Sequence, residues 1–528
     1  MIANNNHTST ICAIATPAGG AISVVRVSGP EAINATARIF VPAGTRSITE
    51  KQGGTLTFGR IVDPVNGETV DEVLVSLFRT PHSYTGEDCT EISCHGSSYI
   101  QTRVVQLLIA QGCVMAQPGE YTQRAFLNGK MDLSQAEAVA DLIASTTAAN
   151  HRMAMQQMRG GFSKRLKDLR EQLLKLTSLM ELELDFSDHE DLEFASRTEL
   201  YDLAQNVRAQ IDRLCRSFSL GNALKRGFPV AIVGETNAGK STLLNALVGE
   251  QRALVSHIHG TTRDTVEETI MLGDTLIRFI DTAGIRATDD AVEQMGIERT
   301  YEKIDEADIV IWMLDATNAL AQYRVLKDKV LRPDKHYLIV LNKTDLISDE
   351  VLQNIKTQLR SEIGSFSQTG TRDGKKPDLK ADCAIGSFSQ TGTGNNDNDT
   401  ANDFAGKALL TVEKAESITA SIKLLSISAH KESHMESLTH ALVQTLSTLR
   451  GTVGNEADVI VSNARHYEAL NHAGQSLDRV VEGLQSGLSG DFISQDLREC
   501  LYYLGSIIGE IPVESVLHSI FKNFCVGK

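Results

Sequence analysis

The sequence contains no long apolar run, since none approaches the roughly 18 residues that a membrane-spanning helix needs. Its opening residues, MIANNNH, carry neither the basic segment nor the apolar segment of a secretory signal. The eight cysteines are scattered, and no two of them form a Cys-x-x-Cys pair. This pattern fits a reducing compartment better than a disulfide framework. We therefore expect a cytoplasmic protein with no membrane span.

Positive charge is scarce as well, because the formal net charge is −16 over 528 residues. Binding to nucleic-acid phosphates requires clustered lysine and arginine side chains. One such cluster begins a predicted helix and consists of Lys164, Arg165, Lys167 and Arg170. A basic helix face is more commonly just solvated, so an RNA contact there is the less favoured explanation.

A complete zinc site is also missing. Cys89, Cys94 and His95 are close in sequence, but a zinc site needs a fourth ligand, so metal binding there is the less favoured explanation. We expect these cysteines to be buried in a strand.

What the sequence does contain is a phosphate-binding motif. Residues 234–241 read GETNAGKS and match G-x-x-x-x-G-K-[ST], between a strand-like run at 228–233 and a helix-forming run. Gly234 and Gly239 let backbone N–H groups point at an anion. Lys240 would supply charge to the β- and γ-phosphates, and Ser241 a hydroxyl to Mg²⁺. The alternative is an ordinary glycine turn, and the next motifs argue against it.

Further motifs follow, each after a strand-like run. Residues 281–284 (DTAG) offer a carboxylate to the Mg²⁺ shell and a glycine N–H to the γ-phosphate. In 342–345 (NKTD), Asp345 can accept two hydrogen bonds from the guanine edge, which adenine does not offer. Residues 428–430 (SAH) could close over the base, and Thr261 and Thr262 lie where a switch loop would present a Mg²⁺-binding hydroxyl. This order predicts a guanine-nucleotide-binding domain.

One position departs from the small signalling GTPases. Ile285 stands where those proteins carry a glutamine that orients the attacking water. Isoleucine cannot do so, hence either hydrolysis is slow or another polar residue takes the role.

The residues before the nucleotide motifs predict an α+β domain over about 8–128. Strand patterns occur at 10–15, 21–27, 73–78 and 90–94. Arg26 lies inside an otherwise apolar strand. It is either an arginine at a strand edge or a buried charge facing an anionic ligand, and the sequence leaves both open.

Helical patterns flank the nucleotide motifs on both sides. Asp132 begins one with a capping-box spacing, and a long amphipathic stripe follows at Leu166, Leu169, Leu173, Leu176 and Met180. Later stripes run through Leu497, Leu501, Leu504 and Ile508 and, beyond Pro512, through Val513, Leu517, Ile520 and Phe524. Neither stretch looks self-sufficient, so we expect 130–220 and 452–528 to pack into one discontinuous helical domain.

A repeated segment interrupts the nucleotide motifs. The nine residues IGSFSQTGT at 363–371 recur at 385–393 within a stretch rich in Gly, Asn, Asp, Lys and Ser. Such low-complexity sequence has little to bury, so we expect residues 363–408 to be a disordered surface insertion.

The chain resembles the MnmE (TrmE) family of tRNA-modification GTPases. Outside the nucleotide motifs the resemblance rests on RVSG at 26–29, YTGED at 84–88, PGEYT at 118–122, RAFLNGKMDL at 124–133 and FCVGK at 524–528. It covers essentially the whole length apart from the insertion and the first few residues. Val526 departs from the isoleucine that is common in the family.

The resemblance implies a multidomain α/β fold. Residues 1–128 would form an N-terminal α+β domain for folate binding and dimerisation. Residues 129–226 and 451–528 would form the two parts of a helical domain. Residues 227–450 would form an inserted Ras-like P-loop GTPase domain, with a parallel-type sheet flanked by helices.

The resemblance also implies a function. Members are K⁺-dependent GTPases that act with the FAD-dependent MnmG (GidA) on tRNA. Together they add a carboxymethylaminomethyl-type group at C5 of the wobble uridine, using a 5-formyltetrahydrofolate-type donor. A homodimer joined by its N-terminal domains would enter a heterotetramer-type complex with MnmG. The folate-contacting positions match Arg26, Glu91, Lys130 and Lys528.

For the nucleotide site the resemblance implies Mg²⁺ at Ser241 and Thr262, and K⁺ at Asn237 with the backbone of Ser256, Ile258 and Thr261. Glu293 matches the carboxylate that orients water, which would answer the question raised by Ile285. The GTP-binding residues would be Asn237, Ala238, Gly239, Lys240, Ser241, Thr242, Ser256, His257, Ile258, His259, Gly260, Thr261, Thr262, Asp281, Thr282, Ala283, Gly284, Asn342, Lys343, Thr344, Asp345, Ser428, Ala429 and His430.

Cys525 is a candidate nucleophile. Modification at C5 of a uridine commonly needs addition at C6, which suits a thiolate, and Lys522 and Lys528 could lower the pKa of the thiol. An idle cysteine near the end of the chain is the alternative, and cysteines of the flavin partner are rivals. Two other functions also stay open: a GTP-dependent assembly or ribosome-associated switch, and a folate-dependent one-carbon transferase with a regulatory GTPase.

Overall fold

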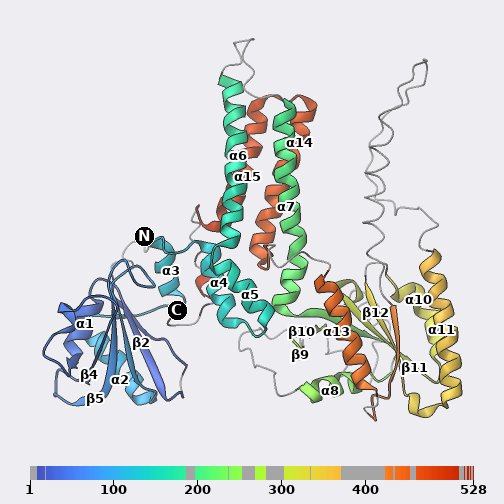
Figure 1. The fold of residues 1–528 in the computed structure, drawn as a ribbon, viewed down its shortest axis with the longest axis horizontal. Helices are drawn as coiled ribbons and strands as arrows, with labels where there is room; N and C mark the ends of the chain where they lie inside the picture. Colours follow the sequence, from blue (N-terminus) through green and yellow to red (C-terminus); the bar gives the residue numbers. More distant parts are fainter. Residues whose placement is uncertain are drawn as a thin grey trace, which may run out of the picture. The chain divides into compact units, whose positions relative to one another are not determined.

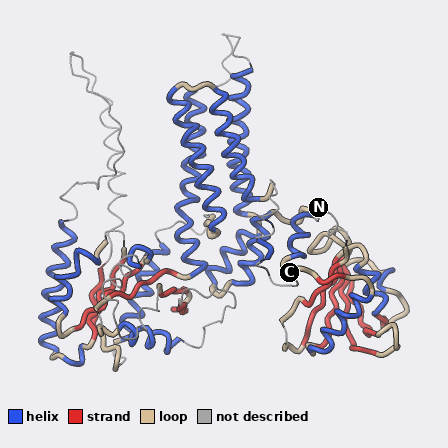
Figure 2. The backbone as a smooth tube through the Cα atoms, turned by 180° about the vertical axis from the view of Figure 1, so that it is seen from behind, coloured by secondary structure: helices blue, strands red, loops and turns tan. Residues whose placement is uncertain are grey.

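The computed structural model of the chain describes residues 9–17, 19–185, 197–235, 237–251, 268–280, 303–332, 335–369, 422–431, 434–451 and 459–510, and positions 517, 520–522, 524 and 527. The chain divides into two compact units, residues 1–221 with 457–528 and residues 222–456. Figure 1 shows the elements of both units, and Figure 2 shows that the strands gather in two separate sheets.

The first unit begins with a seven-stranded sheet in the order β3-β4-β5-β6-β2-β1-β7. Neighbouring strands are antiparallel except for the parallel pair β1–β7. Apolar side chains of α1 and α2 pack against the buried side chains of the sheet. The elements are β1 Ile11–Ile14, β2 Ile22–Ser28, α1 Ala32–Ile39, β3 Phe40–Pro42, the 3-10 turn η2 Ile48–Glu50, β4 Thr55–Val62, β5 Thr69–Phe78, β6 Cys89–His95, α2 Ser98–Ala110 and β7 Val114–Met115.

Arg26 does not lie at a strand edge. Its strand β2 is hydrogen-bonded on one side to β1 and on the other to β6, and Glu91 is its direct partner on β6. Cys89 and Cys94 are buried in β6, while the exposed His95 ring contacts Asp71 at 2.8 Å. Among the described residues, no group of three or more His, Cys, Asp and Glu side chains is placed to hold a metal ion.

The rest of the first unit is helical. Its elements are α3 Glu120–Leu127, α4 Leu133–Ala144, α5 Ala148–Met158, α6 Gly161–Asp185, α7 Arg197–Arg226, α14 Ala464–Ser486 and α15 Gly490–Ile508. The predicted capping box is present: Asp132 accepts from the Gln135 backbone, and the Gln135 side chain accepts from the Asp132 backbone. No helix in the described part of the chain is long and apolar enough to cross a membrane.

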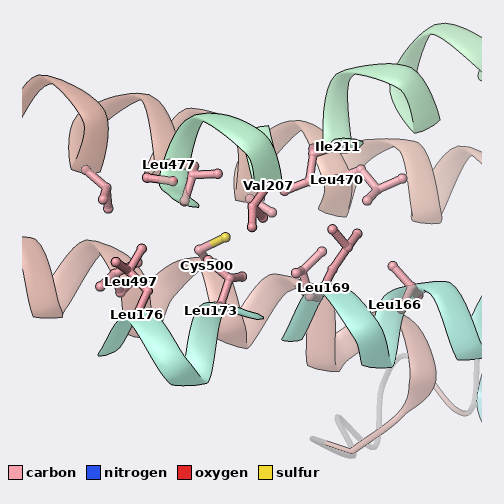
Figure 3. Close-up of a cluster of buried hydrophobic side chains, with 14 of the residues drawn as sticks. Leu166, Leu169, Leu173, Leu176, Val207, Ile211, Leu470, Leu477, Leu497 and Cys500 are labelled. Carbon is pink, nitrogen blue, oxygen red and sulfur yellow. The ribbon is translucent and has the colours of Figure 1, made fainter. Parts of the chain in front are cut away.

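One hydrophobic core is shared by α6, α7, α14 and α15. The nucleotide motifs lie between α7 and α14 in the sequence. The stripe from Leu166 to Met180 is buried there against Val207, Leu477 and Leu497, as Figure 3 shows in part. This confirms the prediction that helical stretches before and after the nucleotide motifs pack together. Near the end of the chain, Leu517 and Phe521 pack against Leu133 and Ala136 of α4.

The second unit holds a six-stranded sheet in the order β13-β12-β11-β8-β10-β9, parallel except for the pair β9–β10. The central strand β11 is buried along almost its whole length, as parallel strands covered on both faces are. The elements are β8 Phe228–Val233, α8 Lys240–Gln251, β9 Glu268–Leu272, β10 Thr275–Phe279, β11 Ile309–Asp315, α10 Ala319–Val330, β12 His336–Asn342, the 3-10 turn η5 Thr344–Leu346, α11 Asp349–Thr369, β13 Ile422–Ser426 and α13 Met435–Gly451.

The repeated insertion is only partly described. Helix α11 continues to Thr369, and Ile363 packs against the core of the second unit. The prediction of disorder is therefore wrong for residues 363–369, because the first copy of the repeat extends an amphipathic helix. Residues 370–408 lie outside the described residues.

Candidate functional site

The loop between β8 and α8 can be formed only with glycine at two positions. Gly234 has φ +154° and Gly239 has φ +96°, both in the region that favours glycine. A Cβ on Gly234 would lie 2.5 Å from the Met313 carbonyl oxygen, and one on Gly239 would lie 2.2 Å from Asn342 Nδ2. At these two glycines the phosphate loop (residues 234–239) therefore lies closely against β11 and β12.

Lys240, the first residue of α8, folds back over the phosphate loop. Its Nζ donates to the carbonyl oxygens of Gly234 at 2.7 Å and Glu235 at 2.9 Å. Burial lowers the pKa of Lys240, and the charge of Glu235 partly opposes this shift. The ammonium group is therefore held at the helix N-terminus by neutral carbonyl groups. Ser241 and Thr242, which follow it, are exposed.

Asn342 joins three of the predicted motifs. Its buried amide nitrogen donates to the carbonyl oxygen of Ala238 at 2.8 Å, and its amide oxygen accepts from the backbone of Ala429 at 3.0 Å. The phosphate loop, the NKTD motif and the SAH motif therefore meet at one side chain. This juxtaposition follows from the parallel order of β8, β11, β12 and β13, whose carboxyl ends lie along one edge of the sheet.

Asp345 lies beside the SAH motif. The Ser428 hydroxyl donates to Asp345 Oδ1 at 2.7 Å, and this hydrogen bond is the main cause that lowers the pKa of the Asp345 carboxyl. Lys431 Nζ lies 3.5 Å from the other carboxylate oxygen. Thr344 is held by the carbonyl oxygen of Ile427, and His430 is exposed in the following turn. An ionised carboxylate at this position can accept two hydrogen bonds from a ligand.

Lys343 adopts a left-handed backbone conformation with φ +61°. Its Nζ donates to Asp315 Oδ2 at 2.7 Å. Asp315 ends β11 and was not singled out from the sequence. The signal that could have identified Asp315 is a carboxylate at the end of a strand, where it can pair with the lysine of the NKTD motif.

Several predicted site residues lie outside the described residues. In the nucleotide site these are Ser256, His257, Ile258, His259, Gly260, Thr261, Thr262, Asp281, Thr282, Ala283, Gly284 and Glu293, and in the first unit they are Cys525 and Lys528. Their roles stay predictions.

A second polar cluster lies in the first unit around Arg26. Its guanidinium group contacts Glu91, with Nε 2.9 Å from Oε1, and Nη1 donates to the Gly527 carbonyl oxygen at 3.4 Å. The rings of Tyr84 and Tyr121 each lie 5.6 Å from the guanidinium carbon. The two tyrosines were missed from the sequence, since their proximity depends on long-range packing.

Gly527 is closely seated at this cluster. A Cβ on Gly527 would lie 2.5 Å from the Ile14 carbonyl oxygen of β1. Lys130, the other described residue predicted to bind folate, is exposed and donates to the Pro81 carbonyl oxygen at 2.9 Å. Arg26 and Glu91 are therefore in direct contact, and Lys130 is anchored separately to the loop that precedes β6.

The parallel sheet, the glycine-dependent phosphate loop and the clustered NKTD and SAH motifs place the second unit in the class of P-loop GTPase domains. Two family models match the chain: "MnmE helical domain" over residues 133–525 and "GTP-binding protein TrmE N-terminus" over residues 10–130.

Curated relatives match almost from end to end. The tRNA modification GTPase MnmE of Bacteroides fragilis is 51% identical over 523 residues, covering 98% of this chain and 99% of the relative. The protein of the same name from Bacteroides thetaiotaomicron is 51% identical with the same coverage, and that of Flavobacterium johnsoniae is 44% identical over 527 residues. The chain belongs to the MnmE family of tRNA modification GTPases and is by class a GTP hydrolase.

Proposed function

We propose that this chain is a K⁺-dependent GTPase that takes part in wobble-uridine modification of tRNA in the cytoplasm. The observation that carries the proposal is the meeting of the phosphate loop, Asp345 and Ser428 around Asn342 in a chain 51% identical to named MnmE proteins. The proposal covers the whole chain because the match spans 98% of it.

The triphosphate of GTP would lie along the phosphate loop, whose backbone N–H groups would point at the phosphates. Lys240 would exchange its carbonyl contacts for the β- and γ-phosphates. Ser241 and Thr262 would hold Mg²⁺, with Asp281 near its shell. Such a metal would neutralise charge as the γ-phosphate leaves.

The guanine base would be read by Asp345. Its carboxylate would accept from N1–H and from the exocyclic amino group, while the backbone of Ala429 and His430 would close over the ring. Because the pKa of Asp345 is lowered, the carboxylate stays ionised at neutral pH and can only accept hydrogen bonds. Adenine offers no matching pair of donors, so ATP would bind poorly.

Glu293 would orient the attacking water, since Ile285 cannot. K⁺, held by Asn237 and the backbone of Ser256, Ile258 and Thr261, would supply the positive charge that an arginine finger provides elsewhere. Asn237 fits this role because its side chain is exposed on the phosphate loop, in a left-handed backbone conformation.

The cluster around Arg26 would bind the folate donor. A cation beside a carboxylate, flanked by two aromatic rings, suits a pterin ring that carries a glutamate tail. Lys130 and Lys528 would contact the same ligand. The chain would act as a homodimer joined by residues 1–128, in a heterotetramer-type complex with the FAD-dependent MnmG. The other proposed domains are 129–226 with 451–528, and 227–450.

Rates of nucleotide hydrolysis by the purified protein test the proposed GTPase chemistry. GTP hydrolysis should be much faster in K⁺ than in Na⁺ at equal ionic strength, and ATP should not be hydrolysed. Glu293→Ala should lower kcat by roughly 10²-fold, in the range for loss of a group that orients or activates the nucleophile, with GTP affinity nearly unchanged. Equal rates in the two salts would contradict the K⁺ site. Equal hydrolysis of ATP would contradict the base assignment.

A further inference from the structure

A buried glutamine on α10 bridges two parts of the nucleotide site. Gln322 is 7% exposed, and its Nε2 donates to Glu235 Oε2 at 2.7 Å. Its Oε1 accepts from the backbone N–H of Asp315 at 2.9 Å. Glu235 belongs to the phosphate loop, and Asp315 ends β11. One side chain therefore connects the phosphate loop to the end of the central strand.

The connection continues to the base-binding loop. Asp315 Oδ2 accepts from Lys343 Nζ at 2.7 Å, and Oδ1 accepts from the Thr317 backbone at 3.0 Å. Burial raises the pKa of Asp315, but the hydrogen bonds from Lys343 and Thr317 outweigh it and the pKa is lowered. An unbroken series of contacts thus runs from Glu235 through Gln322 and Asp315 to Lys343.

Glu235 is a carboxylate in a loop that would bind a polyanion. Its backbone carbonyl and that of Gly234 accept from Lys240 Nζ, so a shift of the Glu235 backbone would also move the contacts of this lysine. A carboxylate that turned toward the phosphates would repel them. The hydrogen bond from the Gln322 amide to this carboxylate is charge-assisted and fixes its direction.

We propose that Gln322 is a positioning residue for GTP: it fixes the Glu235 carboxylate and keeps the phosphate loop aligned with the base-binding loop. The inference rests on the proposed function, because it concerns the affinity of the same site.

Only an amide satisfies both contacts at this position. The glutamine side chain donates through nitrogen and accepts through oxygen, whereas an ionised glutamate can only accept. The backbone of α10 is also well anchored there, because Tyr323 stacks on Trp312 of β11 with ring centroids 5.3 Å apart. The Gln322 side chain therefore extends from a fixed helix rather than from a mobile loop.

The test exchanges the glutamine at 322 and the glutamate at 235 in the full-length protein. The affinity for GTP is measured by titration of a fluorescent GTP analogue. Gln322→Glu places two carboxylates in contact and should raise Kd by roughly tenfold or more, with kcat at saturating GTP within about twofold. Adding Glu235→Gln should restore Kd to within about threefold of wild type. In that double variant the new amide at 235 donates to the glutamate at 322, whose second oxygen still accepts from Asp315.

Gln358→Glu is the matched control, because Gln358 is exposed on α11 of the same unit and its amide nitrogen donates to Asn354 Oδ1 at 3.1 Å. It should leave Kd and kcat unchanged. If Gln322→Glu does not fold, Gln322→Met removes both contacts at similar volume and should raise Kd by a comparable factor.

A wild-type Kd for GTP in Gln322→Glu or Gln322→Met would overturn the inference. A double variant that has the Tm of the wild type but keeps the raised Kd of Gln322→Glu would overturn it as well. Wild-type protein that fails to prefer GTP over ATP would instead overturn the proposed function, so the two failures can be told apart.

Discussion

At the scale of single residues, the proposed choice of base rests on Asp345. Ser428 occupies one carboxylate oxygen and Lys431 lies near the other, so a base would bind with partial displacement of these contacts. Base binding would then depend on the two carboxylate oxygens of Asp345, because no other residue of the NKTD motif carries a carboxylate.

Asp345→Asn should therefore change the base preference. The new amide can donate to the 2-oxo group of xanthine, while it no longer offers guanine two acceptors. GTP affinity should fall by roughly 100-fold, and xanthosine triphosphate should bind better than GTP. Competition titrations with both nucleotides measure this, and Asp349→Asn, an exposed change in the first turn of α11, is the control. Unchanged GTP binding in Asp345→Asn would remove Asp345 from base recognition.

A buried ion pair fixes α4 to α14 in the first unit. Glu137 is 7% exposed and contacts the Arg465 guanidinium at 2.9 Å and 3.0 Å and the His466 ring at 2.5 Å. Burial raises the pKa of Glu137, but the charges and hydrogen bonds of His466 and Arg465 outweigh it and bring the pKa to about 2, from 4.5. The stability from this carboxylate is therefore fully present above about pH 4.5 and is lost as pH falls toward 2.

Glu137→Gln should destabilise the helical part of the first unit by about 3 kcal/mol at pH 7, because it removes one member of a buried pair. Urea unfolding followed by helical circular dichroism measures the change, and the difference from wild type should shrink as pH falls from 4.5 toward 2. Glu181→Gln is the control, since the Glu181–Arg498 pair is largely exposed and should contribute less than about 1 kcal/mol. Equal effects of the two variants would contradict the account of the cluster.

At the scale of elements, the end of α11 at Thr369 marks how much of the predicted insertion belongs to the folded second unit. Ile363 packs against the core of the second unit, whereas residues 370–408 consist largely of small and polar residues that could bury little. The first nine-residue repeat therefore begins inside a helix that the second unit needs.

Deleting residues 370–408 should leave Tm and K⁺-stimulated hydrolysis near wild type, because their composition offers little to bury and a shorter connection changes the loop-closure entropy only slightly. Extending the deletion to 363–408 should lower Tm, since it removes the Ile363 contact and the last helical residues. Thermal melts of both deletions are the measurement. A large fall in Tm for the shorter deletion would show that the repeat is structural.

The strands and helices could be predicted because their signals are local. The run before the phosphate loop, the capping box at Asp132 and the stripe from Leu166 to Met180 each fix an element within a few residues. The contacts that assemble the sites could not be predicted in this way. Gln322 and Glu235 are 87 residues apart in sequence, and Arg26 and Glu91 are 65 apart. Both contacts therefore depend on the order and register of the strands. The match of motifs to a family supplied the candidate sites that local patterns leave undetermined.

At the scale of the whole molecule, the chain combines a GTPase unit with a unit that carries the Arg26 cluster and the end of the chain. Its net charge of −16 gives no general attraction for RNA, so the proposed tRNA binding would need a local basic patch or the surface of the proposed flavin partner. Of the basic residues that begin α6, Arg170 is paired with Glu510. Cys525, two residues before Gly527 in sequence, stays a candidate nucleophile, with cysteines of the proposed flavin partner as its rivals.

The central claim is that this chain takes part in modifying the wobble uridine, and nucleoside analysis of bulk tRNA tests it most directly. Cells that lack the protein should lose the carboxymethylaminomethyl-type uridine, and expression of the wild-type chain should restore it. Cys525→Ser should fail to restore it while keeping wild-type GTP hydrolysis, which would assign the chemistry to the thiol. Unaltered tRNA nucleosides in cells without the protein would contradict the claim.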